Sequence, residues 1–299
     1  MVANLPGLGL AAILLLIPAV SSAPPAAHRE EWEAWRARRL QSLRREDGWL
    51  SLVGLFWLQE GENTVGSDPK GRVVLPAGKV PARIASITLT KGSVSIHAEP
   101  GSGLTVDAHV VTSMPLATDA DGAQPTVLRV GSISFYVIAR GSRLGVRVKD
   151  SEAQTRKSFG GIETFPYEEK YRIEARFEPY DPPRQIPVPN VLGTVETQPS
   201  PGALVFELAG KTYRLDPVLE TGETDLFVIF GDETNGHESY GGGRFVYAKP
   251  AVGGKTVLDF NRAYNPPCVF TPYATCPLPP KQNRLSVRIE AGEKTYGEH

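Results

Sequence analysis

Cysteine is scarce in this sequence, with only Cys268 and Cys276 among 299 residues. No Cys-x-x-Cys or His-x-x-x-His spacing occurs and the five histidines are scattered, so no metal site is expected. The glycine–serine turn of many serine hydrolases is missing too, because His237 stands where the first glycine of Gly-x-Ser-x-Gly around Ser239 would be. The sequence therefore predicts neither a metal nor a cofactor.

An excess of charge of either sign is also absent. Lys and Arg number 32 against 33 Asp and Glu, which gives a formal net charge of −1. Such a chain has no overall field that would hold nucleic acid or an acidic membrane, so neither is an expected partner. We expect a small polar molecule as the partner, and the sequence leaves the oligomeric state open.

The apolar run Leu8–Val20 is too short to span a bilayer, but it has the length of a signal-peptide core. The small residues Ser21, Ser22 and Ala23 follow it. We expect a signal peptide at residues 1–23, cleaved after Ser22 or Ala23, and a periplasmic or secreted protein with no stable membrane insertion. An uncleaved anchor is the alternative, because residues 1–7 contain no Lys or Arg.

Export to an oxidising compartment predicts a disulfide between Cys268 and Cys276. Closing so short a loop would contribute about 2–3 kcal/mol by chain entropy. The bond would stiffen a loop and would not hold the fold together.

The stretch from His28 to Asp47 is rich in helix formers, and its tryptophans and leucines recur at helical spacing, which predicts one helix. Its other face is rich in arginine. That face is either an anion-binding surface or, as we favour, a solvated face balanced by glutamates. The arginines of that face are Arg29, Arg36, Arg38, Arg39, Arg44 and Arg45.

Gly48–Leu58 is apolar throughout and is expected to be a buried strand or strand-turn.

After Gly61 the sequence consists of short alternating runs separated by Gly, Pro, Asp and Ser, a pattern typical of antiparallel sheet. It predicts a mainly β antiparallel sandwich or partly open barrel with one N-terminal helix. We expect one domain over residues 24–299, and the Pro-rich stretch 180–201 is either a boundary between two halves or a strap across one domain. The expected strands are Ser86–Thr90, Ser93–Ala98, Ser132–Ala139, Leu144–Lys149, Lys170–Phe177, Ala203–Leu208, Lys211–Leu215, Leu226–Phe230, Arg244–Tyr247, Lys255–Phe260 and Leu285–Glu290.

Polar and aromatic residues gather between residues 232 and 280. Three consecutive glycines precede Arg244 and would either direct backbone N–H groups at an anion or, as we favour, permit a tight bend. Asp259 and Asn261 are expected on one face of a strand that runs into a proline-stiffened loop. That loop either walls a ligand pocket or covers a sheet edge.

Two hypotheses for function follow. The first is a binding protein that holds a small polar ligand in a pocket built by residues 232–280. The second is a hydrolase in which a carboxylate acts as general acid or base beside Arg147 or Arg244. The candidate ligand-binding residues are Tyr240, Arg244, Asp259, Asn261, Arg262, Tyr264 and Asn265, and the candidate catalytic residues are Asp232, Glu238 and Asp259.

Several motifs resemble the bacterial and archaeal family known as domain of unknown function 1684. They are GWLSLVGLFWLQEGENTVGS (48–67), RLGVRVKDS (143–151), FGGIETFP (159–166), ESYGGGRF (238–245), DFNRAYNPPCVFTPYATCPLPPKQNRL (259–285) and EAGEK (290–294). The resemblance implies that the segments from about Trp32 to Lys294 form one unit. It implies no activity, because none is assigned to the family.

Overall fold

The computed structural model describes residues 25–297, so the predicted signal peptide lies outside the described residues. Within that range the chain has seventeen strands and two helices, which confirms a mainly β fold with one N-terminal helix. The helices are α1 (Pro25–Leu43) and the single turn α2 (Gln154–Lys157). The strands are β1 (Leu52–Trp57), β2 (Gly61–Gly66), β3 (Val73–Val74), β4 (Ala85–Thr90), β5 (Ser93–Ala98), β6 (Thr105–Val106), β7 (His109–Val110), β8 (Ser113–Pro115), β9 (Leu128–Val130), β10 (Ile133–Arg140), β11 (Arg143–Asp150), β12 (Arg172–Pro189), β13 (Val195–Leu208), β14 (Lys211–Leu215), β15 (Leu226–Phe230), β16 (Arg244–Ala248) and β17 (Lys255–Asp259).

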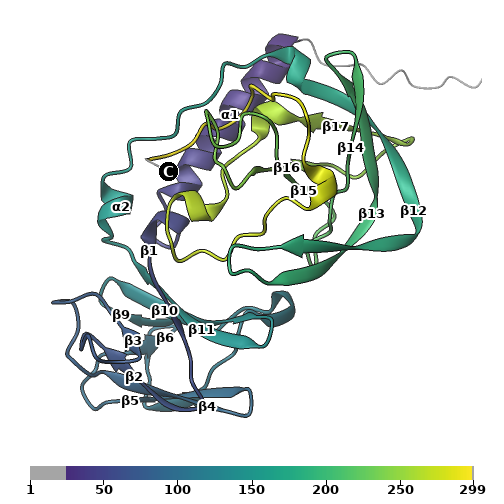
Figure 1. Ribbon diagram of the computed structural model, residues 1–299. Helices are drawn as coiled ribbons and strands as arrows, with labels where there is room; N and C mark the ends of the chain where they lie inside the picture. Colours follow the sequence, from purple (N-terminus) through teal and green to yellow (C-terminus); the bar gives the residue numbers. More distant parts are fainter. Residues whose placement is uncertain (1–24, 298–299) are drawn as a thin grey trace, which may run out of the picture.

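The N-terminal lobe contains two sheets that share one hydrophobic core (Figure 1). One sheet has the order β1-β11-β10-β9-β6-β7 and the other β3-β2-β4-β5-β8. Strand β5 shows why the two sheets pack together. Its buried and exposed residues alternate strictly, so one face of the strand points into the shared core and the other into solvent. The predicted hairpins β4–β5 and β10–β11 are confirmed, and each is a continuous antiparallel pair.

The C-terminal lobe is built around a second core. Its four-stranded sheet, β14-β13-β12-β17, curves around the buried hairpin β15–β16 (Figure 1). All five residues of β15 are buried, as expected for a strand covered on both faces. Helix α1 lies along this lobe, where the Trp32 indole N–H donates to the carbonyl of Asn261 at 2.8 Å. No helix in the described part of the chain is long and apolar enough to cross a membrane.

The Pro-rich stretch 180–201 lies within one long hairpin formed by β12 and β13. The register breaks between Pro179 and Arg184, which brackets the prolines at 182 and 183. Beyond the break β12 pairs with β13 alone, so its other edge has no strand partner and proline is tolerated there. The two cores instead divide between Val148 and Tyr171.

Two local predictions need correction. Leu285–Glu290 is not a strand: the Ile289 N–H donates to the Asp232 carboxylate at 2.8 Å and the Glu290 N–H to the Tyr171 hydroxyl at 3.2 Å. Backbone groups of Gly231 and Glu233 pair with Leu285 and Val287, whereas side chains accept from Ile289 and Glu290, so no continuous partner strand forms. The stretch 48–58 begins with a 3-10 turn that contains the buried Leu50, and in β1 Leu52 and Gly54 are buried while the other residues are partly buried.

Candidate functional site

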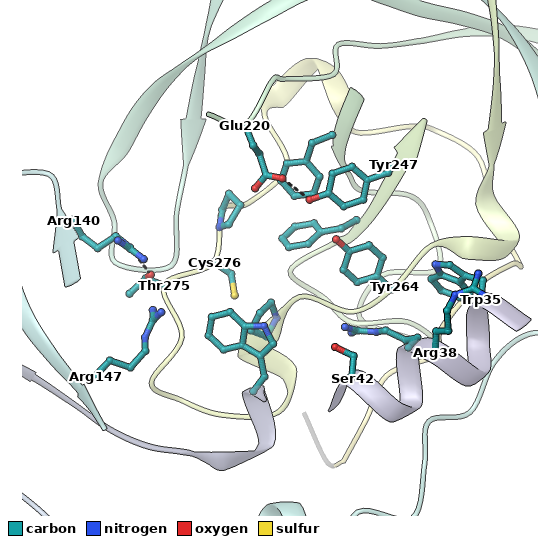
Figure 2. Close-up of a pocket in the computed structure, with 16 residues that line it drawn as sticks. Trp35, Arg38, Ser42, Arg140, Arg147, Glu220, Tyr247, Tyr264, Thr275 and Cys276 are labelled. Atoms are coloured by element: carbon teal, nitrogen blue, oxygen red, sulfur yellow. Dashed lines mark hydrogen bonds between the residues drawn. The ribbon is translucent and has the colours of Figure 1, made fainter. Parts of the chain in front are cut away.

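A cavity of about 620 Å³ opens where the two lobes and helix α1 meet (Figure 2). We call it the arginine cavity. It receives side chains from α1, from β10 and β11 of the N-terminal lobe, and from β15, β16 and the loops of the C-terminal lobe. Its lining comprises Trp35, Arg38, Arg39, Ser42, Trp49, Arg140, Arg147, Glu220, Phe227, Phe245, Tyr247, Tyr264, Pro267, Thr275, Cys276 and Pro277.

Helix and strand periodicity explain why these residues meet. On α1, Trp35, Arg38, Arg39 and Ser42 follow the spacing of one helix face. On β11, Val146 and Val148 belong to the N-terminal core, so the alternation of the strand sends Arg147 to the opposite face. That face is the one beneath the C-terminal lobe.

Arg147 is a buried cation with no acidic partner among residues 25–297. The residue is 4% exposed, and among the described residues its guanidinium makes one hydrogen bond, from Nη1 to the Tyr136 hydroxyl at 3.4 Å. Its Nε has no hydrogen-bond acceptor. The guanidinium carbon lies 5.1 Å from the ring centre of Trp49, and Figure 2 shows the side chain directed toward the loop of Thr275 and Cys276. A buried charge normally has a partner, so Arg147 is the unusual member of the site.

The other arginines of the cavity differ from Arg147. Arg39 pairs with Glu293 at 3.1 Å and lies 4.7 Å from the ring centre of Tyr264. Arg140 pairs with Asp119 at 3.0 Å and donates to the Thr275 hydroxyl at 3.1 Å.

Arg38 is exposed and lies on α1, on the far side of the cavity from Arg147 (Figure 2). The one acidic lining residue is Glu220, which accepts a hydrogen bond from the Tyr247 hydroxyl. The cavity is therefore positively charged.

An aromatic wall separates the charged ends of the cavity. Phe227 stacks on Tyr247 with ring centres 4.8 Å apart, and Tyr247 and Tyr264 are nearly parallel at 6.3 Å. Burial raises the pKa of both Tyr247 and Tyr264, so their phenols stay protonated at neutral pH. Flat apolar surface beside a cation suits a ligand with an anionic group on a flat body.

Cys276 lines the same cavity, Cys268 follows the lining residue Pro267, and both cysteines are free thiols in this structure. The Cys268 N–H donates to the Cys276 sulfur at 3.1 Å. The predicted disulfide is not formed in this structure, although the two residues are adjacent as the prediction requires.

The predicted pair Asp232 and Arg244 lies away from the arginine cavity. Both side chains are fully buried, with Arg244 Nη2 2.9 Å from Asp232 Oδ1. The guanidinium also donates to the carbonyls of Ala291 and Ile289. Burial lowers the pKa of Arg244, while the Asp232 carboxylate opposes that shift. Asp232 and these two carbonyls surround the guanidinium, which is the pattern of a structural ion pair.

The three glycines before Arg244 form a tight bend. Gly243 has φ of +88°, and a Cβ there would lie 2.4 Å from Pro279 Cγ and 2.6 Å from the carbonyl oxygen of Phe230. Both features require glycine. The tight bend that we favoured for these glycines is therefore explained by the positive φ and the close contacts of Gly243.

Asp259, Arg262 and Tyr264 do come together, in a second cavity of about 620 Å³ that we call the Asp259 cavity. It shares Trp35, Tyr247 and Tyr264 with the arginine cavity. Strand β17 ends at Asp259, so Asn261 follows in a turn, not on the same strand face as predicted. The Asp259 carboxylate accepts the Asn261 backbone and side-chain N–H groups, at 3.1 and 3.0 Å.

The remaining candidates lie elsewhere. Glu238 pairs with Arg288 on the surface, which holds the pKa of its carboxyl below the usual range. Asn265 is buried and donates its side-chain N–H to the Lys294 carbonyl at 2.6 Å. Tyr240 packs beside the core that contains Val269 and Phe270 and hydrogen-bonds to the Cys268 thiol. Of the predicted ligand residues, Tyr264 alone lines the arginine cavity.

The sequence analysis missed most of the cationic lining. The arginine-rich face of residues 28–47 was the available signal, and we assigned it to solvent. Arg147 was named as an electrostatic partner, but nothing in the sequence set it apart from its strand neighbours.

Residues 157–294 match the family described as "Protein of unknown function (DUF1684)", and the chain belongs to this family. The matched segment covers the C-terminal lobe, so the motifs at 48–67 and 143–151 lie outside it. Among solved structures, the chain is similar to an uncharacterised protein of Haloarcula marismortui determined by solution NMR. That similarity has 32% identity, a TM-score of 0.41, and covers 48% of this chain and 81% of the other. No curated protein matches the chain.

Proposed function

We propose that this protein binds a small molecule that carries a carboxylate, phosphate or similar anionic group on a flat, largely apolar body. The observation that carries the proposal is Arg147, which is 4% exposed and lacks an acidic partner among the described residues. A ligand anion would supply the missing counter-charge through charge-assisted hydrogen bonds.

The surroundings of Arg147 support the same ligand class. Lys149 lies 5.9 Å from the ring centre of Trp49, so a second cation shares the aromatic face that Arg147 uses. Arg140 is held toward the cavity by Thr275. The aromatic wall of Phe227, Tyr247 and Tyr264 offers the flat surface for the body of the ligand. A volume of about 620 Å³ falls in the usual range for small-molecule sites.

The hydrolase hypothesis receives less support. None of Asp232, Glu238 and Asp259 lines the arginine cavity, and its acid Glu220 is exposed and bonded to Tyr247. Hydrolysis by general acid and base catalysis would need two titratable groups close to one substrate. Binding is therefore the function we put forward, and we propose it for an exported protein, on the strength of the apolar run at 8–20.

A matched pair of fluorescent probes tests the proposal. 1-Anilinonaphthalene-8-sulfonate has a sulfonate on a flat aromatic body, and N-phenyl-1-naphthylamine has the same body without the charge. We expect Arg147→Met to weaken binding of the sulfonate by about 10- to 100-fold, the value of a charge-assisted hydrogen bond. Binding of the neutral probe should change little.

Arg143→Met is the matched control. Arg143 lies on the same strand but stacks on Trp57 at 3.8 Å and does not line the cavity. Equal loss of both probes in Arg147→Met, or equal loss of the sulfonate in Arg143→Met, would contradict a specific anion site. Benzoate and phenyl phosphate should displace the sulfonate, whereas benzyl alcohol should not.

A further inference from the structure

The two cysteines sit in a loop that forms one wall of the arginine cavity. Cys268 lies in a 3-10 turn at Pro267–Val269, and Cys276 lines the cavity. The Cys268 N–H donates to the Cys276 sulfur at 3.1 Å, so the two residues lie side by side. Figure 2 shows the Cys276 side chain among the residues that surround the cavity.

The surroundings of the two thiols differ. The Cys276 thiol and the Tyr240 hydroxyl both hydrogen-bond to the Cys268 sulfur, and these bonds lower the pKa of Cys268 despite its burial. The same bond to Cys268, together with burial, raises the pKa of Cys276. Cys268 is also the more exposed of the two. This exposure places Cys268 to attack an incoming disulfide as a thiolate, with the buried Cys276 beside it to resolve the product.

We propose that Cys268 and Cys276 form a thiol–disulfide couple in which Cys268 attacks and Cys276 resolves. With a low-molecular-weight disulfide such as oxidised glutathione, the Cys268 thiolate attacks one sulfur and releases one glutathione thiolate. The Cys276 thiol then loses its proton and attacks the Cys268 sulfur of the mixed disulfide. The second glutathione leaves as a thiolate that takes up a proton. The first glutathione thiolate takes up the proton that Cys268 lost on forming its thiolate. Overall the protein loses two protons and two electrons, and oxidised glutathione becomes two thiols.

This couple has a consequence for binding, and that part rests on the proposed function. Closing the bond draws the Cys276 sulfur toward Cys268 and fixes the segment that carries Thr275, which holds Arg140 at 3.1 Å. The same segment is already anchored by the Cys276 carbonyl, which accepts from the Val191 N–H at 3.0 Å. A wall fixed in advance costs less to order when a ligand binds, so the oxidised protein should bind the anionic naphthalene probe about two- to tenfold more tightly.

Mass spectrometry of the intact protein tests the couple without any ligand. After incubation with oxidised glutathione, the unaltered protein should lose two hydrogens and carry no adduct. Cys276→Ser should trap one glutathione at Cys268, whereas Cys268→Ser should react far more slowly. Tyr240→Phe should slow the reaction of Cys268 while leaving the product unchanged.

Three results would overturn the inference: no loss of hydrogens in the unaltered protein, a stable adduct on it, or equal trapping in the two serine variants. Because the unaltered protein provides the first readout, the test does not depend on the folding of any variant. If the couple forms but probe binding is the same before and after oxidation, the link to the cavity is overturned. If no probe binds in either state, the proposed binding function fails while the couple stands.

Discussion

Two buried arginines in this protein should differ sharply in how much the same substitution destabilises the fold. Arg244 is fully buried against the equally buried Asp232, whereas Arg147 is 4% exposed and has no acid beside it. Arg244→Met would leave the Asp232 carboxylate buried without its cation. Breaking a buried ion pair in this way costs about 3–5 kcal/mol. At roughly 2–4 °C per kcal/mol, the melting temperature should fall by about 10 °C.

Arg147→Met removes a charge whose burial no acid offsets. The lost contacts are one long hydrogen bond to Tyr136 and the stacking on Trp49, the latter worth about 0.5–2 kcal/mol. Relief of the unpaired buried charge acts in the opposite direction. We therefore expect the free energy of unfolding to change by no more than about 1 kcal/mol. A binding residue is often retained at some cost to stability, which is the pattern predicted here.

Differential scanning calorimetry of the two variants, with and without the anionic naphthalene probe, measures both effects. The ligand-free Arg147→Met protein should melt within a few degrees of the unaltered protein but gain no stability from the probe. If Arg147→Met lowers the melting temperature as much as Arg244→Met does, Arg147 is a structural residue. A ligand anion would then not be the partner of Arg147.

Two further predictions concern Asp259 and the N-terminus. Burial raises the pKa of Asp259, so the folded state favours the protonated carboxyl, and this stabilisation is lost as pH rises through the raised value. The unaltered protein should therefore lose stability relative to Asp259→Asn as the pH rises from about 3.5 to 7. The difference in melting temperature, variant minus unaltered protein, should begin to increase near the ordinary carboxyl pKa. Asp225→Asn, which removes an acid paired with Lys249, is the control, and a flat difference for Asp259→Asn would contradict the assignment. Expression of the full chain in a bacterial host should yield a periplasmic protein whose N-terminus follows Ser22 or Ala23, and an intact N-terminus in the membrane fraction would indicate an anchor.

Local sequence patterns predicted most of the elements. The hairpins β4–β5, β10–β11 and β13–β14 were each marked by alternating residues around a turn with glycine, and all three are present. Helix α1 was also predicted, although it ends at Leu43, four residues before the expected end at Asp47. The strand predicted at Leu285–Glu290 is absent because the Ile289 and Glu290 N–H groups bond to the side chains of Asp232 and Tyr171, and no local pattern reveals such distant partners.

The candidate site was predicted less well, for a related reason. Sequence proximity grouped Arg244, Asp259 and Asn261 with Tyr264. The fold pairs Arg244 with Asp232 and keeps Asp259 and Tyr264 together in the Asp259 cavity, and of the four only Tyr264 lines the arginine cavity. Arg38 and Arg147 are more than a hundred residues apart in the chain. They line one cavity because α1 and β11 meet there.

The sequence by itself determined the mainly β class, the helix, the family and the closeness of the two cysteines, because each depends on residues near one another in the chain. Tertiary structure alone decided which charges are paired. Asp232 lies twelve residues from Arg244 and neutralises it, whereas the packing of two lobes buries Arg147 with no acid in reach. Burial and pairing of a charge depend on what lies across the core, and that is why the site became visible only in the folded chain.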